Sequence, residues 1–372
     1  MFKTRVALLA CLLTVQAHSQ LLGVLGGGGA PAPMSTFPAV ADGVTATVDL
    51  DFVANTGYNN GTTGTAVSMI TVSRNQANTN LLPSSPVGFA STTFPANTAR
   101  IDANGLLVEP SRINQLFPSF PPGNTTLTTG SLANGTYTLW VACSSGSPGC
   151  TATLGNGTST TCSSGSQAVQ GTAITFTTSG TAGTCTVTTA GTPVGVQLEL
   201  GGTGSSLIPT TSAAVTRPAE VVTLTGTVAS GTGATVFTSA QTFQLASAGP
   251  ALGGYSDNTT SNRMYNTIQT GGNAQSAVTF TTGGTQCNNF MGTFVLSAVG
   301  KMALAYGSGG NSSYNGSAPA TCSPGSTALT AGLLTTLNIG GNVGAFLGGY
   351  VKRTALWPST RISNPTLQAM TQ

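Results

Sequence analysis

Charged side chains are so rare in this chain that its few acids and bases mark the places where ionic chemistry could occur. Asp, Glu, Lys and Arg make up 5% of its 372 residues, whereas a soluble globular domain usually carries about 25%. Glu109 and Arg112 nevertheless stand three positions apart in the apolar segment GLLVEPSRINQLFP, residues 105–118. We predict that they form a structural ion pair, because an arginine fork binds a carboxylate and a helical or turned segment would bring the two together. A chance pair on a solvated face is the alternative.

The acids are too dispersed to form a catalytic pair. Glycoside hydrolysis usually needs two carboxyl groups on either side of the scissile bond. Asp49 and Asp51 are close together, but alternate positions on a strand suit a cation or solvent equally well. No histidine follows His18, so a Ser-His-Asp triad is not expected. We predict no catalytic residues and no cofactor, since Walker and Rossmann fingerprints are also missing from the sequence. A glycan-cleaving enzyme is an alternative.

Two segments carry residue types that suit ligand binding. The segment GGYSDNTTSNRMYN, residues 253–266, holds Tyr255, Asp257, Arg263 and Tyr265. Aromatic rings cover the apolar faces of sugars and a few fixed polar groups orient them, so we predict a sugar site here. An ordinary strand–loop–strand is the alternative.

The second segment is basic and lies near the C-terminus, at Lys352 and Arg353, with Arg361 close behind. These cations are expected to face outward, where they could meet acidic sugars or an acidic neighbouring protein, or simply be solvated. The net charge of +3 provides no electrostatic footprint for nucleic acid.

The cysteines indicate an oxidising destination. Beyond Cys11 they form an even set: Cys143, Cys150, Cys162, Cys185, Cys287 and Cys322. None has CxxC spacing, so no metal site is predicted. One interpretation pairs Cys150 with Cys162 across a hairpin at Asn156-Gly157, Cys143 with Cys185, and Cys287 with Cys322. Six reduced thiols are the alternative.

The N-terminus has the pattern of a targeting segment. Lys3 and Arg5 precede an apolar run at 6–15, and Ala17-His18-Ser19 resembles a cleavage site, so residues 1–19 are typical of a secretory signal peptide. An apolar peptide that is retained and inserts into a larger assembly is the alternative. The Gly- and Pro-rich residues 20–44 predict a flexible tether.

The remaining chain predicts an all-β fold. Short runs of β-branched and apolar residues, such as VGVQLEL at 194–200, alternate with turns rich in Gly, Asn and Ser, which is the pattern of antiparallel β-sandwiches. Asn364-Pro365 predicts the start of a short C-terminal helix. We place the boundaries as follows: an N-terminal strand and connector at 45–122, a first β-sandwich at 123–228 and a second at 229–372.

Several short sequence words follow one another along the chain: ITVSR, ARID, GLLVEPSRIN, then VQLELGG with SLIPTTSAAVTRPAEVV, and a final block that ends in LQAMT. Their order resembles that in phage virion structural proteins of the head-spike, tail-fibre or minor-tail type. The positions that match the two main motifs are Arg112, Asn114, Leu116, Glu199, Ile208, Pro209, Thr210, Thr216, Arg217, Ala219 and Glu220, and Ile113 stands where the first motif usually has Thr. The resemblance covers about residues 45–372.

This resemblance implies tandem antiparallel β-sandwiches, jelly-roll-like and then concanavalin A/laminin-G-like. It implies a non-enzymatic fibre, spike or decoration of a phage or prophage, located in the virion. We expect a homo-oligomer whose partners are other virion proteins and a host surface glycan. The signal-like N-terminus departs from the pattern, because a protein assembled in the cytoplasm needs no export. A secreted or cell-surface bacterial adhesin with a lectin-like domain, extracellular after signal-peptide cleavage, is therefore the alternative.

Overall fold

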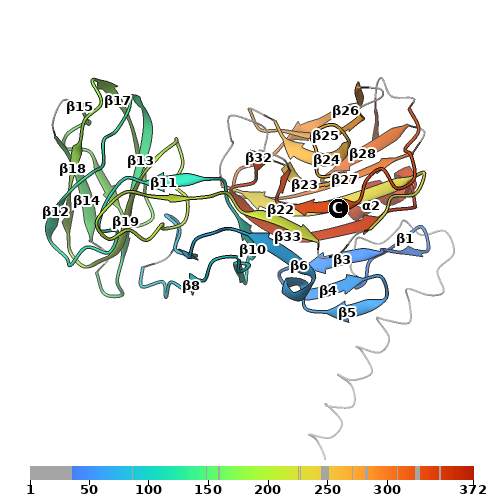
Figure 1. The fold of residues 1–372 in the computed structure, drawn as a ribbon, viewed down its shortest axis with the longest axis horizontal. Helices are drawn as coiled ribbons and strands as arrows, with labels where there is room; N and C mark the ends of the chain where they lie inside the picture. The colour runs from blue at the N-terminus through green and yellow to red at the C-terminus, as the bar shows by residue number, and fades with distance from the viewer. Residues whose placement is uncertain are drawn as a thin grey trace, which may run out of the picture.

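The computed structural model describes residues 36–372, except for residues 86, 148, 158–159, 225, 227, 244–250, 270, 281–283, 308, 323–326 and 343–344. The predicted signal peptide and residues 20–35 of the predicted tether lie outside the described residues. Within them the chain is all-β, as predicted: two antiparallel sandwiches lie beside one another, the first in green and the second mainly in yellow to red (Figure 1). No helix in this part of the chain has the length and apolar character that crossing a membrane requires.

The first sandwich packs two sheets over one hydrophobic core. In the described residues its larger sheet has the order β15 (Thr160–Thr161), β17 (Ile174–Gly180), β13 (Gly135–Cys143), β19 (Pro193–Leu200), β11 (Arg112–Asn114) and β20 (Val215–Arg217). The facing sheet has the order β12 (Thr125–Thr128), β18 (Cys185–Ala190), β14 (Thr151–Asn156) and β16 (Gln167–Val169). Alternate residues of β18 are buried, which is the period of two expected of a strand with one face on a core.

The second sandwich is larger. Among the described strands, one sheet has the order β29 (Ala320–Thr321), β28 (Gly310–Tyr314), β27 (Val299–Tyr306), β22 (Ala234–Thr242), β33 (Gly349–Trp357), β3 (Val48–Asp51), β4 (Thr56–Asn59) and β5 (Thr62–Gly64), with β10 (Gly105–Val108) on β33 and β9 (Ile101–Asp102) on β10. The facing sheet has the order β26 (Gly284–Thr293), β25 (Asn273–Phe280), β24 (Arg263–Ile268), β23 (Ala251–Ser256), β30 (Thr336–Ile339), β21 (Val221–Leu224) and β6 (Ile70–Ser73).

Short elements complete the fold. Three two-stranded ladders are described: β1 (Val40–Ala41) with β2 (Val44–Thr45), β7 (Asn78–Thr79) with β8 (Thr93–Phe94), and β31 (Gly341–Asn342) with β32 (Ala345–Phe346). A 3-10 turn, η1 (Ala66–Met69), precedes β6. The first ladder corrects the tether prediction for residues 40–44, and the N–H of Ala39 there donates to the Asp49 carboxylate at 2.8 Å.

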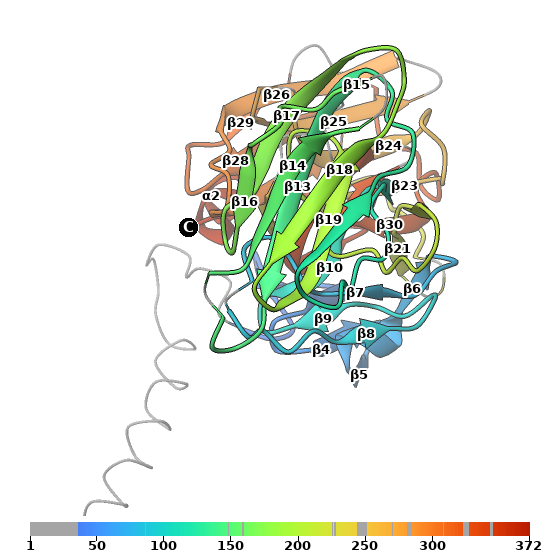
Figure 2. The same cartoon turned by 90° about the vertical axis from the view of Figure 1, so that its left-hand side faces the viewer.

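The domain boundaries differ from those expected from the sequence. Residues 45–122 were predicted as an N-terminal strand and connector, but β3 pairs with β33 and β6 pairs with β21. The strands of this segment have four residues or fewer, so they bury their apolar side chains only by joining larger sheets. The described residues therefore start in strands of the second sandwich, leave it after β10 to form the first, which faces the viewer in Figure 2, and return at β21.

The C-terminal helix is confirmed. It is α2 (Asn364–Met370), with Ser363 at the N-cap position and a proline in its first turn. Leu367 and Met370 are buried and pack in one apolar cluster with Trp357. This contact anchors the end of the chain on the sheet that contains β33.

The described chain contains three disulfides: Cys143–Cys150, Cys162–Cys185 and Cys287–Cys322. All six cysteines that were predicted to pair are disulfide-bonded, and Cys287–Cys322 is as predicted. The suggested pairs Cys150–Cys162 and Cys143–Cys185 in the first sandwich are wrong. The reason is topological: β14, which follows Cys150, lies in one sheet, whereas β15, which precedes Cys162, pairs with β17 in the other. The predicted hairpin between them does not form, so Cys150 and Cys162 do not face one another.

Candidate functional site

Five charged side chains gather where the two sandwiches meet, and all are at most 3% exposed. We call them the junction ion cluster; among the described residues its members are Arg74, Arg100, Glu109, Arg217 and Glu220. Glu109 Oε2 accepts from Arg100 Nη2 at 2.7 Å and from Arg217 Nη1 at 2.9 Å. Glu220 binds both Arg74 and Arg100, with Arg100 Nε at 2.9 Å.

The cluster joins segments that are far apart in the sequence. Arg74 follows β6, Glu109 follows β10 and Glu220 precedes β21, so these belong to the second sandwich, whereas Arg217 ends β20 of the first. Removing one partner from a buried pair leaves an uncompensated charge and is strongly destabilising. The cluster therefore fixes the two sandwiches against one another.

Electrostatics favour the ionised form of Glu109. Burial by itself would raise its pKa, but Arg217 and Arg100, together with hydrogen bonds from Ser206, outweigh burial and lower the pKa to about 2. The Ser206 N–H donates to Glu109 Oε1 at 2.7 Å and the Ser206 hydroxyl to Oε2 at 2.5 Å. Glu109 is thus a fixed anion at neutral pH and has a structural role.

The predicted pair of Glu109 with Arg112 is wrong. Residues 105–108 and 112–114 are strands in different sheets, so no helical turn brings the two side chains together. Arg112 instead lies with its Nε 3.5 Å from Glu199 Oε2. Burial raises the pKa of Glu199, although hydrogen bonds from Ser205 act in the opposite direction.

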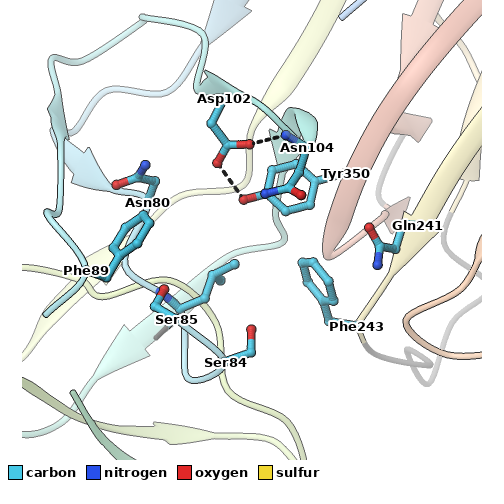
Figure 3. A pocket seen from close by; sticks show the side chains of 10 residues that line it. Asn80, Ser84, Ser85, Phe89, Asp102, Asn104, Gln241, Phe243 and Tyr350 are labelled. Atoms are coloured by element: carbon cyan, nitrogen blue, oxygen red, sulfur yellow. Dashed lines mark hydrogen bonds between the residues drawn. The ribbon is translucent and has the colours of Figure 1, made fainter. Parts of the chain in front are cut away.

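A cleft lies beside this junction and consists of two hollows. The tyrosine hollow has a volume of about 240 Å³, and its lining includes Asn80, Phe89, Asp102, Asn104 and Tyr350 (Figure 3). The threonine hollow has a volume of about 520 Å³, and its lining includes Pro83, Thr138, Thr175, Thr203 and Ser297. Both hollows share Leu82, Ser84, Gln241 and Phe243, so they are parts of one cleft between the sandwiches.

The tyrosine hollow has a fixed polar edge and two accessible rings. Tyr350 donates its hydroxyl proton to Asp102 Oδ2 at 2.8 Å, and the N–H of Asn104 donates to Asp102 Oδ1 at 2.7 Å. Burial and the adjacent Asp102 raise the pKa of Tyr350, so the hydroxyl keeps its proton. Phe243 contacts the Tyr350 ring edge-to-face at 5.5 Å, and Phe89 lies on the opposite side of the hollow (Figure 3).

The structure separates the residues of the predicted sugar site at 253–266. Tyr255 is fully buried in the core, and its hydroxyl binds the carbonyl of Val228. Asp257 accepts from Thr259 and Asn262 within its own turn. The Arg263 guanidinium stacks on the Tyr265 ring at 4.5 Å. Because Tyr255 points inward, it cannot present its ring to a ligand together with Tyr265.

The predicted basic patch is also divided. Lys352 and Arg353 are consecutive on β33, at a β-bulge in its pairing with β22, and different groups bind them. Lys352 Nζ donates to the carbonyl of Asn104 at 2.9 Å, at the edge of the tyrosine hollow. Arg353 binds the buried carboxylate of Asp49, with Nε at 2.9 Å from Oδ1. Across the described residues, no group of three or more His, Cys, Asp or Glu side chains is arranged to hold a metal ion.

Sequence reasoning missed the cleft and most of the junction ion cluster. The cleft residues come from the loop between β7 and β8, the turn after β9, the ends of β22 and β33, and the first sandwich. No local pattern distinguishes them. The cluster had a usable signal, since Arg100, Arg217 and Glu220 lie in the words ARID and TRPAE of a chain almost devoid of charge.

The sequence matches no family model and no curated protein. Among solved structures, the chain is similar to the sialidase CBM40 of Ruminococcus gnavus bound to α2,6-sialyllactose, with 14% identity and a TM-score of 0.31 over 41% of this chain and 96% of that one. The native heptameric SAP-like pentraxin of Limulus polyphemus has 14% identity and a TM-score of 0.28 over 39% and 71% of the chains. The Trypanosoma rangeli sialidase in complex with the inhibitor DANA has 11% identity and a TM-score of 0.30 over 41% and 27%.

Proposed function

We propose that the protein is a non-enzymatic virion component of a phage or prophage, a fibre, spike or decoration, that binds a surface glycan in the cleft between its sandwiches. The observation that carries the glycan-binding proposal is the composition of the cleft. It presents the half-buried rings of Phe89 and Phe243 beside the carboxylate of Asp102 and the amides of Asn80 and Asn104. Apolar surfaces with a few well-placed polar groups are typical of small-ligand sites.

The walls of the cleft are held rigid, which supports a binding role. Leu81 packs with Trp140 and Leu207 of the first sandwich, while Leu82 packs with Tyr350 of the second. The loop between β7 and β8 is therefore fixed on both sides, and the junction ion cluster adds buried ion pairs. A site that is already organised loses less conformational entropy when a ligand binds.

The lining supports binding without cleavage. Among the described residues that line the two hollows, Asp102 is the only carboxylate. Its two oxygens already accept from Tyr350 and Asn104. Hydrolysis of a glycosidic bond usually requires a second carboxyl group across the bond, and the cleft described here offers none.

Glycan binding is tested with the purified full chain on an array of bacterial surface polysaccharides, followed by titration calorimetry on the positives. We expect Phe243→Ala to weaken binding at least tenfold, because it removes the ring shared by both hollows. Phe290→Ala is the matched control, since Phe290 is 60% exposed on β26 and lines neither hollow. Absence of binding to every polysaccharide, or equal binding by Phe243→Ala, would contradict the proposal.

A secreted or cell-surface adhesin is the second candidate, and the three disulfides favour it. Disulfides form and persist in oxidising compartments and are rare in the cytoplasm. Mass spectrometry distinguishes the two locations. Recovery of the chain from purified phage particles supports the virion; recovery from the medium of uninfected cells, with a mature start at Gln20, supports secretion.

A further inference from the structure

We infer that the cleft is specific for an uncharged oligosaccharide of at least two sugar units, one in each hollow. This inference rests on the proposed glycan-binding function and specifies its ligand class. It follows from three features of the cleft: its charge, its hydrogen-bonding groups and its division at Phe243.

The charge of the lining disfavours acidic sugars. Asp102 is the only charged residue among the described residues that line the two hollows. An anionic sugar would meet this carboxylate without an arginine fork to bind its own. Lys352 lies at the edge, where its ammonium group donates to the Asn104 carbonyl and is attracted by Asp102. The local charges therefore offset one another, and the hollow offers no net attraction to an acid.

The hydrogen-bonding groups match sugar hydroxyls, which both donate and accept. The tyrosine hollow contributes the amides of Asn80, Asn104 and Gln241. The Asn80 side-chain carbonyl already accepts from the Thr92 N–H, and the Gln241 NH₂ group donates to the Ser297 carbonyl. The threonine hollow contributes the exposed hydroxyl of Thr175, whereas the buried Thr138 hydroxyl already donates to the Gly201 carbonyl at 2.7 Å. Amides and hydroxyls carry donors and acceptors together, so they pair with a neutral hydroxyl in either direction.

The shape of the cleft implies more than one sugar unit. Its two hollows, of about 240 and 520 Å³, meet at Gln241 and Phe243. The ring of Phe243 thus lies where a linkage between units would cross from one hollow to the other. A single unit would fill one hollow and leave the polar groups of the other solvated, so affinity should rise when a second unit is added.

The test uses calorimetric titration of the full chain with glucose, galactose and mannose, with neutral oligosaccharides of two to six such units, and with lactose against 3′-sialyllactose. We expect neutral oligosaccharides to bind at least tenfold more tightly than their monosaccharides. We expect sialylation to weaken the binding of lactose. Affinity should be nearly unchanged between 50 and 500 mM salt, since screening acts on interactions between charges.

Variants on each side of Phe243 show whether both hollows are used. Asn104 and Thr175 are exposed, so Asn104→Ala and Thr175→Val should fold normally and each weaken oligosaccharide binding by at least fivefold. Thr177→Val on the same face of β17 is the matched control and should bind normally. Three results would overturn the inference and leave glycan binding intact: tighter binding of 3′-sialyllactose than of lactose, equal affinity for monosaccharides and their oligosaccharides, or weaker oligosaccharide binding in only one of the two variants. If none of these sugars and no polysaccharide on the array binds, the proposed function is overturned as well.

Discussion

Replacing Glu109 with glutamine is the sharpest test of the junction ion cluster. The glutamine side chain would have nearly the same shape and could still accept from the Ser206 N–H, which donates to Oε1 of Glu109. Its amide NH₂ group, however, would replace Oε2, the acceptor for both Arg100 and Arg217. Donors would then face donors, and two buried guanidinium groups would lose their shared anion.

The expected magnitude follows from the pKa of Glu109. The shift from an ordinary value of 4.5 to about 2 corresponds to about 3 kcal/mol, at 1.36 kcal/mol for each unit. Breaking a buried ion pair usually costs about 3–5 kcal/mol, which agrees. We therefore expect Glu109→Gln to lower the free energy of unfolding by about 3 kcal/mol at pH 7, which for a chain of 372 residues corresponds to a melting temperature lower by roughly 4 °C.

The sign of the pH dependence is also determined. A carboxyl group whose pKa is lower in the folded state than in the unfolded state stabilises the fold at any pH above its unfolded-state pKa. This contribution is lost as the pH falls toward its folded-state pKa. The wild-type chain should therefore lose stability relative to Glu109→Gln between pH 4.5 and pH 2. The difference in the free energy of unfolding between the wild-type chain and Glu109→Gln should decrease steadily over that pH range.

Urea unfolding provides the assay, with tryptophan fluorescence as the signal. Trp140 lies in the first sandwich and Trp357 in the second, and both are buried. Glu199→Gln is the matched control: Glu199 is equally buried, but burial raises its pKa, so the fold disfavours its charge and removal of that charge should not destabilise the protein. Equal losses for the two variants, or a Glu109→Gln deficit that persists unchanged at pH 2, would refute the reasoning.

Two further predictions concern single contacts of the first sandwich. Arg112→Ala should lower the free energy of unfolding by only about 1 kcal/mol, because its Nε is 3.5 Å from Glu199, and Glu199 keeps its hydrogen bonds from Ser205 and Gln197; a loss above about 2 kcal/mol would indicate a stronger pair. Replacing Cys162 and Cys185 together with serine should cost about 3 kcal/mol, and replacing Cys143 and Cys150 about 2 kcal/mol, because the first disulfide closes 23 residues and the second 7. The reverse order of melting temperatures would contradict this ranking.

The sequence by itself determined the fold class, the C-terminal helix and the set of paired cysteines. These follow from local rules: alternate burial along a strand has a period of two, and a proline is tolerated in the first turn of a helix. Charge scarcity also directed attention to Glu109, which is indeed part of the junction ion cluster. Its burial could be expected, since an apolar run surrounds it.

Only the tertiary structure decided which groups meet. In a β-fold the neighbours of a residue lie on other strands, often far along the chain, so spacing in sequence does not identify them. Glu109 bypasses Arg112 and binds Arg217, 108 positions away, and Asp102 meets Tyr350 across 248 positions. The cleft likewise exists only because the first sandwich is inserted between strands of the second, which brings their side chains to one surface.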